Sequence, residues 1–248
     1  GSVETVAGVG ARGRHYPPAP GTLPAVFLRT PWDVELYGGA LIVSVAGSHQ
    51  LWRLDREAGT ATYLAGTGAE GVRNGSAATA TLAQPSGLDG SRALYFADAE
   101  SSSIRAFDPA EGGIVRTVAG PTDGLFTFGR RDGATEEALF QHPTDVAVVN
   151  GAVYVTDTYN NAIRRIAGGA VTTVAGGEAG WVDGTAPRFD APSAIDVYGD
   201  TAYIADTNNH AVRRLDLERR VATTMLIVTS EPDAVAVPRT EHTVDAMV

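Results

Sequence analysis

The chain has 248 residues, of which 44% are hydrophobic and 19% are charged, and this balance is typical of a folded protein rather than a disordered one. It contains no cysteine, which excludes disulfides, thiolate metal sites and cysteine nucleophiles. The formal net charge is −10 and all 19 basic residues are arginines, so nucleic acid, whose phosphates need many cations, is disfavoured as a partner.

Four similar units follow one another along the chain. Each opens with a proline, and the four prolines lie 54, 58 and 49 residues apart. They are Pro31, Pro85, Pro143 and Pro192. A repeat of about this length is typical of arrays, solenoids and propellers.

The third unit shows the pattern most clearly. An apolar stretch at 145–149 is followed by Asn150-Gly151, a strong signal for a two-residue hairpin. Further strands are expected at 153–157, 162–166 and 171–176, with a polar turn and a Gly-Gly pair between them. Four short strands joined in this way form one antiparallel meander, and meanders repeated radially are the blades of a β-propeller.

We therefore predict an all-β chain with four complete four-stranded blades. Residues 3–8 repeat the motif of the fourth strands and are expected to be the outer strand of a preceding blade. The predicted division is 1–8 for that outer strand, 9–26 for an inter-blade loop, 27–80, 81–137, 138–186 and 187–228 for the blades, and 229–248 for an exit linker or tail.

An aspartate ends the second strand of three units. Asp98, Asp157 and Asp206 each precede a polar turn, and we expect them to accept hydrogen bonds from the backbone of that turn. The first unit carries Ser44 where the others carry Asp. A calcium loop is the rival interpretation, although the closing glutamate and the mid-loop glycine of such loops are missing. Seven residues after each Asp comes an arginine that we expect to brace neighbouring blades or to lie at the rim: Arg105, Arg164 and Arg213.

The loops between units, 66–81, 120–138 and 176–187, are longer than hairpins need, and such loops often carry function. A shared Asn-Gly or Asp-Gly pair in each indicates a repeated structural turn. The residues that differ between loops are candidates for binding, because aromatic residues and arginines form interface hot spots. They are Phe126, Phe128, Arg130, Arg131 and Trp181. The alternative for the two phenylalanines is that they plug the channel mouth as core residues.

Four residues next to opening prolines are candidates for the channel mouth. They are Trp32, Asp33, His142 and Asp145. Two carboxylates and an imidazole could hold a divalent cation, as in propeller lactonases and lyases; the alternative for His142 is ordinary capping or packing. No nucleophile elbow, phosphate-binding loop or dinucleotide fingerprint appears, so we predict no catalytic residue, no metal site and no cofactor.

The motifs together resemble the NHL repeat. Residues 205–210 read Ala-Asp-Thr-Asn-Asn-His, and Ile-Arg-Arg and Thr-Val-Ala-Gly follow at matching places in the third unit. Residues 31–34, 97–102 and 125–129 are similar to the thioredoxin-like proteins known as NHL-repeat-containing protein 2, and the resemblance covers roughly residues 3–237. It implies a six-bladed propeller preceded by a thioredoxin-like domain, whose cysteine pair does not occur here.

The function expected from these patterns is a non-catalytic scaffold whose rim binds a protein or peptide, within a larger thioredoxin-like NHL protein. The alternative is a metal-dependent hydrolase or lyase with its site in the channel. We expect no nucleic-acid or membrane partner, and we expect open blade faces to allow self-association. The first residues lack the pattern of a secretory signal, so the expected compartment is the cytoplasm.

Overall fold

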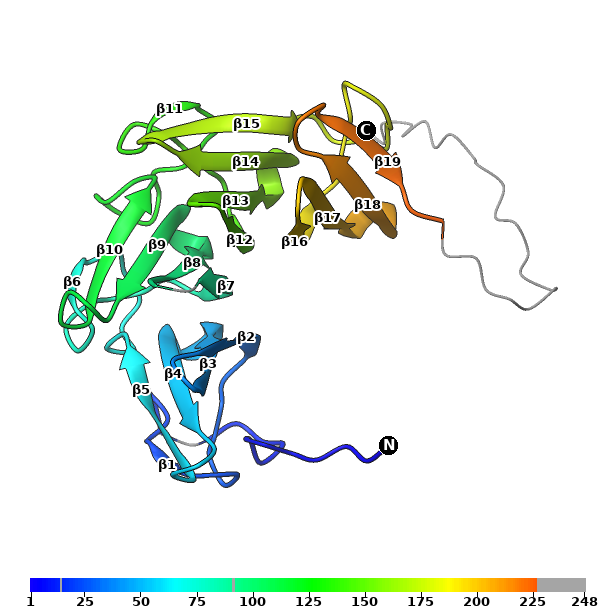
Figure 1. Cartoon of the computed structure of the whole chain (residues 1–248). Coiled ribbons are helices and arrows are strands. Elements are labelled where there is room, and N and C mark those ends of the chain that lie inside the picture. Colours follow the sequence, from blue (N-terminus) through cyan, green and yellow to red (C-terminus); the bar gives the residue numbers. More distant parts are fainter. Residues whose placement is uncertain (14, 91, 227–248) are drawn as a thin grey trace, which may run out of the picture.

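A computed structural model of the chain describes residues 1–13, 15–90 and 92–226. The predicted exit linker, 229–248, lies outside the described residues. The described part is built from β-strands and four single-turn 3₁₀ helices (Figure 1). None of its helices is long and apolar enough to cross a membrane.

Four antiparallel sheets form the blades, each with its strands in chain order from the inside to the outside. Blade 1 comprises β2 (Pro31–Tyr37), β3 (Ala40–Val45), β4 (Gln50–Asp55) and β5 (Thr60–Ala65). Blade 2 comprises β7 (Pro85–Gly90), β8 (Leu94–Asp98), β9 (Ser103–Asp108) and β10 (Ile114–Ala119). Blade 3 comprises β12 (Asp145–Val149), β13 (Ala152–Asp157), β14 (Ala162–Ala167) and β15 (Ala170–Gly176). Blade 4 comprises β16 (Pro192–Tyr198), β17 (Thr201–Asp206), β18 (Ala211–Asp216) and β19 (Val221–Thr224).

Each inter-blade loop adds a short fifth strand to the outer edge of the blade that it leads into. These strands are β1 (Gly21–Thr22), β6 (Gly75–Ser76) and β11 (Gly133–Ala134), which pair with β5, β10 and β15. In blade 4 a single bridge between Gly184 and Ala222 takes the same place. The glycines that follow Asn74, Asp132 and Asp183 therefore lie at the outer edge of the next blade.

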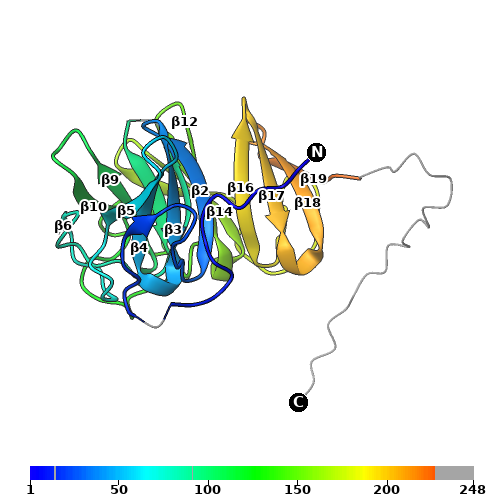
Figure 2. The same ribbon diagram turned by 90° about the horizontal axis from the view of Figure 1, so that it is seen from below.

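The blades follow one another around a common axis, with β2, β7, β12 and β16 innermost (Figures 1 and 2). Blades 1 and 4 stand at the two ends of an open arc. The predicted four complete blades are present, and the fold is that of an all-β propeller.

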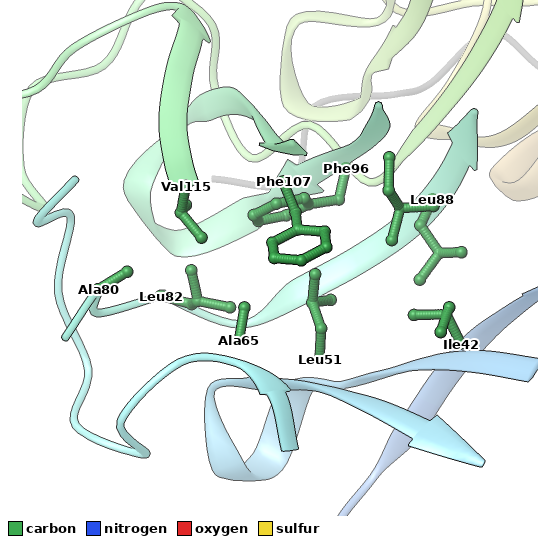
Figure 3. Close-up of a cluster of buried hydrophobic side chains, with 10 residues drawn as sticks. Ile42, Leu51, Ala65, Ala80, Leu82, Leu88, Phe96, Phe107 and Val115 are labelled. Carbon is green, nitrogen blue, oxygen red and sulfur yellow. The ribbon is translucent and has the colours of Figure 1, made fainter. Parts of the chain in front are cut away.

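Apolar side chains from facing sheets fill the space between neighbouring blades. Between blades 1 and 2, Ile42 and Leu51 meet Phe96, Phe107 and Val115 (Figure 3). In each of the first three blades, the second residue of the third strand packs against the following blade. These residues are Leu51, Ile104 and Ile163, and all three are completely buried. Because both faces of a blade are buried in this way, the strand sequences are apolar rather than strictly alternating.

Residues 3–8 have no strand, and the Gly8 N–H donates to the Pro24 carbonyl. Their place as the outer strand of a preceding blade stays a prediction. One expectation is corrected. In blade 1, the residue that corresponds to the strand-ending aspartates is Val45, not Ser44. Val45 pairs with the first residue of β4, as Asp98 and Asp157 pair with the first residues of β9 and β14.

Candidate functional site

A buried ion pair stands at the same place in blades 2, 3 and 4. Asp98 and Arg105 lie 2.8 Å apart, Asp157 and Arg164 2.5 Å, and Asp206 and Arg213 2.7 Å, all with fully buried side chains. The backbone donors to these aspartates are not in the turn that follows them. They belong to the preceding inter-blade loop, at Ala83, Gln141 and Asp190. The Asp–Arg pairs thus fasten each incoming loop to its blade.

The arginines also hold the Asn-Gly and Asp-Gly turns of these loops. Arg164 donates to Asp132 (2.7 Å) and to the carbonyl of Arg131 (2.9 Å), and the Asp132 carboxylate accepts the N–H and hydroxyl of Thr173. Burial opposes ionisation of Asp132, but these hydrogen bonds and the charge of Arg164 outweigh it and lower its pKa. Arg105 with Asn74 and Arg213 with Asp183 repeat the contact, so the predicted structural turn is confirmed.

Blade 1 replaces this ion pair with two apolar side chains. Val45 stands in the place of the aspartate and Trp52 in the place of the arginine, and both are fully buried. The Trp52 indole N–H donates to Gln50 at 3.2 Å, which satisfies the one polar group that the exchange brings in. Both charges are absent together, so no unpaired charge remains in the core.

The inner strands carry carboxylates that link one blade to the next. Asp33 accepts the Leu88 N–H at 2.9 Å, and Asp145 accepts the Ile195 N–H at 2.8 Å. Asp89, which the sequence patterns did not single out, accepts the Val148 N–H at 2.6 Å. Burial, together with the nearby Asp33 and Asp89 carboxylates, raises the pKa of Asp145 to about 7.

Close approach of β7 and β12 depends on a glycine. A Cβ built on Gly87 would lie 1.9 Å from an Asp145 carboxylate oxygen and 2.6 Å from the Asp145 Cα. The two inner strands could not keep this spacing with any side chain at position 87.

The carboxylates and the histidine near the channel do not converge. Within the described residues, no three His, Asp or Glu side chains lie close enough together to hold a metal ion. Asp33 and Asp145 are engaged with backbone N–H groups, and His142 lies with the 3₁₀ turns rather than among the inner strands. Trp32 is about half exposed.

The remaining candidates gather at one end of the molecule, which we call the loop face. It consists of the inter-blade loops 66–84, 120–142 and 177–191 and the 3₁₀ turns Ala46–Ser48, Ala99–Ser101, Thr158–Asn160 and Thr207–Asn209. Here Phe126 is 90% exposed, Phe128 52% and Trp181 51%, so none of them is a core residue. The Trp181 indole N–H donates to the Thr224 hydroxyl at 2.9 Å, which fixes the orientation of its ring.

His142 belongs to a small cluster on this face that includes two residues the sequence patterns missed. Its ring stacks on Tyr159 with centroids 4.4 Å apart, and its Nδ1 lies 3.6 Å from a Glu100 carboxylate oxygen. Burial lowers the pKa of His142, and Glu100 partly opposes that shift. The Asn160 side chain donates to the Gly129 carbonyl, which brings the segment containing Phe128 alongside the turn that carries Tyr159.

Two arginines complete the loop face. Arg130 donates to the Gly177 carbonyl of the following loop, and Arg131 donates through Nε to the Glu137 carbonyl at 2.6 Å. Both side chains are exposed beyond these contacts. The loop face of blades 3 and 4 thus presents exposed aromatic rings beside exposed arginines.

A hollow of about 240 Å³ lies on the outer strands of blade 4, and a second of about 130 Å³ lies between the end of β10 and the loop 120–142. Both are smaller than the roughly 300–1,000 Å³ of typical small-molecule pockets.

Radial four-stranded meanders and buried inter-blade faces define the protein as a β-propeller. Residues 140–166 match the NHL repeat family. The chain is 40% identical over 197 residues to Protein SUPPRESSOR OF QUENCHING 1, chloroplastic, of Arabidopsis thaliana, and 33% identical over 202 residues to human NHL repeat-containing protein 2. The chain belongs to the NHL-repeat propeller family.

These alignments cover 73% and 66% of this chain but only 18% and 26% of the two relatives. Among solved structures, an auxiliary nutrient binding protein from Bacteroides ovatus superposes with a TM-score of 0.60 at 20% identity, over 82% of this chain and 50% of that one. A streptogramin B lyase superposes with a TM-score of 0.51 at 12% identity, over 81% and 55% of the two chains. At these identities the likeness is one of fold.

Proposed function

We propose that the chain is a non-catalytic scaffold that binds a protein or peptide through the loop face of blades 3 and 4. The observation that carries this proposal is the set of exposed aromatic rings, Phe126, Phe128, Tyr159 and Trp181, on loops that buried Asp–Arg pairs hold in place. A surface that is already ordered loses little conformational entropy on binding.

The chemistry of the face indicates the kind of partner. Exposed rings favour apolar side chains, and Arg130 and Arg131 favour carboxylates, so we propose an extended segment that carries both. The inner-strand carboxylates are already engaged by backbone N–H groups, and for that reason we propose no metal-dependent reaction in the channel.

The test is a selection of peptides by phage display on the chain, followed by fluorescence anisotropy with the selected peptides. Exchange of Phe128 and Tyr159 for alanine together should weaken binding about tenfold or more, the size of a lost aromatic hot spot. Tyr198→Ala is the control, because Tyr198 is an even more exposed ring that lies at the far end of β16, and it should leave binding unchanged. Peptides that bind the double variant as tightly as the original chain would contradict the proposal.

A further inference from the structure

At each of the three junctions between blades, the loop face repeats one backbone arrangement. The second residue of a 3₁₀ turn donates its N–H to the carbonyl two residues before the opening proline of its own blade. These pairs are Glu100 with Ala83, Tyr159 with Gln141, and Asn208 with Asp190. The residue directly before the proline has a positive φ each time, 60° at Gln84, 50° at His142 and 46° at Ala191. The backbone therefore sets the positions of these side chains without setting their identity.

The side chains at these positions differ from junction to junction. A side chain that the fold required would recur, as the buried aspartates and arginines of the blades do. The place before the proline carries Gln84, His142 and Ala191, and the second place of the turn carries Glu100, Tyr159 and Asn208. Of the three junctions, the one between blades 2 and 3 brings a carboxylate, an imidazole and an aromatic ring together at these places.

Glu100, His142 and Tyr159 form a compact polar site, which we call the junction site. The His142 and Tyr159 rings stack with an angle of 15° between their planes, and Tyr159 is 59% exposed, so one face of its ring is covered while the side chain stays open to a ligand. The Glu100 carboxylate lies 3.6 Å from Nδ1 of His142, which favours the tautomer with its proton on Nδ1 and leaves Nε2 as an acceptor. In the described chain no arginine forms an ion pair with Glu100, whose side chain is 43% exposed.

The chemistry of the junction site favours a cation that carries several N–H donors. An aromatic ring attracts a cation through its quadrupole, a carboxylate pairs with it, and a neutral imidazole nitrogen accepts a hydrogen bond from it. A guanidinium group suits all three because it is planar, stacks on rings and carries five N–H donors, whereas an ammonium group is a compact point charge. The net charge of −10 on the chain adds a general attraction for cations.

We propose that the junction site binds an arginine side chain of the partner. The guanidinium group stacks on Tyr159 and donates to the Glu100 carboxylate and to Nε2 of His142. This inference deepens the loop-face proposal and rests on it for the partner. The extended segment proposed above then carries an arginine in addition to its apolar and acidic side chains.

Binding at the junction site depends on the protonation of His142. Among the described residues, Glu100 is the charged group that acts on His142, and Tyr159 is the titratable group against which its ring packs. Burial lowers the pKa of His142 more than Glu100 raises it, so the ring is neutral above its ordinary pKa of 6.5. As the pH falls through the folded pKa, Nε2 gains a proton and can no longer accept, and the affinity for a guanidinium group falls.

The test is an NMR titration with N-acetyl-arginine methylamide, and N-acetyl-citrulline methylamide is its neutral analogue of nearly the same shape. At pH 7.5 the arginine probe should shift the ring resonances of His142 and Tyr159 in a saturable way, and the citrulline probe should not. Glu100→Gln should weaken binding of the arginine probe about tenfold. Glu137→Gln removes the same charge from an exposed place on the loop face and should leave binding nearly unchanged. Equal binding of the two probes, or full binding by Glu100→Gln, would overturn the cation site.

Two variants at position 142 copy the other junctions. The ring resonance of His142 gives its pKa, and affinity is measured one pH unit above and below that value. His142→Gln, which copies Gln84, keeps an acceptor that does not titrate, so its affinity should fall less between the two pH values than that of the original chain. His142→Ala, which copies Ala191, removes the acceptor and should bind weakly at both. Amide NMR spectra check that each variant is folded, and an original chain whose affinity is equal at the two pH values contradicts the role of Nε2.

The small probes separate this inference from the proposed function. If the arginine probe does not bind but displayed peptides still bind through Phe128 and Tyr159, the junction site is wrong and the loop-face proposal stands. If the probe binds but no displayed peptide does, the junction site stands and the loop face is not a peptide-binding surface.

Discussion

At the scale of the residue, the strongest local constraint is the buried Asp–Arg pair. Asp157 accepts the Gln141 N–H at 2.8 Å and holds the Arg164 guanidinium, and neither side chain contacts water. If the carboxylate is lost alone, the positive charge stays buried without compensation. Blade 1 shows that the propeller accepts the loss of both charges at once.

Asp157→Ala should therefore lower the free energy of unfolding by about 3–5 kcal/mol. Asp157→Val combined with Arg164→Leu should cost less than Asp157→Ala alone, because it removes the buried charge together with its partner. Urea denaturation of Asp157→Ala, of the double variant and of its two single variants, Asp157→Val and Arg164→Leu, measures the difference. A double variant whose loss equals the sum of the two single losses would show that the residues are not coupled.

Asp145 makes stability depend on pH. Its folded pKa of about 7 lies above the unfolded value of roughly 3.9, so folding takes up a proton between these values. The stabilisation that comes from the protonated Asp145 carboxyl is complete below the unfolded pKa, and it is lost as the pH rises through the folded pKa of about 7. The loss is at most about 4 kcal/mol, since the two N–H donors to this carboxylate favour its ionised form.

The measurement is urea denaturation between pH 5 and 8 for the chain and for Asp145→Asn. The variant cannot ionise at this position, so the difference in unfolding free energy between the two proteins should shrink as the pH rises. A difference that stays constant, or that grows toward pH 8, would place the ionisation elsewhere.

At the scale of the element, each inter-blade loop is positioned by one side chain near its outer turn. Asp132 joins the loop 120–138 to Arg164 and to Thr173 of β15. Blade 2 makes the same connection with Asn74, so the charge is less important than the acceptor. The exposed rings of the loop face depend on this anchoring for their order.

Asp132→Ala should cost about 1–2 kcal/mol and should accelerate amide exchange at Thr173, because its N–H loses its acceptor. Exchange in β12 and β13 should hardly change. Asp132→Asn, which copies blade 2, keeps one oxygen for Arg164 and the Thr173 hydroxyl, so it should cost less stability than Asp132→Ala, although the Thr173 N–H loses its acceptor in both variants. Hydrogen exchange read by mass spectrometry or NMR follows the amide and urea denaturation follows the stability; equal losses of stability in the two variants would contradict the assigned role.

The repeat made the blades predictable because each strand, turn and opening proline recurs with the same polarity. The inner-strand carboxylates were only half predicted, since Asp89 and Asp196 stand two residues further along than Asp33 and Asp145. The cluster of His142 with Tyr159 and Glu100 could not be predicted, because three separate turns bring these side chains together. In blade 1 the sequence pattern placed the counterpart of the aspartate at Ser44 instead of Val45. The register could not be read from charged residues there, because Val45 and Trp52 replace both members of the ion pair.

At the scale of the whole molecule, the arginines are fewer at the surface than the composition suggests. Arg105, Arg164 and Arg213 are completely buried in ion pairs, and the remaining basic residues are outnumbered by acidic ones. A large positive surface, on which nucleic-acid affinity depends, is therefore hard to assemble.

We expect no binding to single-stranded RNA at physiological ionic strength. Fluorescence anisotropy with a labelled oligonucleotide, repeated at decreasing salt, measures this. Micromolar binding that weakens steeply as salt is added would mean that the exposed arginines cluster on one surface. The variant Arg130→Ala with Arg131→Ala would then show whether the loop face is that surface.

The inner-strand aspartates and the N–H groups that they reach alternate from blade to blade. Asp33 and Asp145 stand two residues after their opening prolines and accept an N–H three residues after the next proline, whereas Asp89 stands four residues after its proline and accepts an N–H five residues after the next one. This alternation restricts how such an array can grow during evolution. If a single blade were duplicated, two blades of the same type would become neighbours. Two carboxylates would then compete for one N–H, while another N–H at the same junction would be left without an acceptor. Duplication of two adjacent blades together keeps every donor matched. An array that grows by duplication of blade pairs therefore keeps these hydrogen bonds, and a ring built in that way contains an even number of blades.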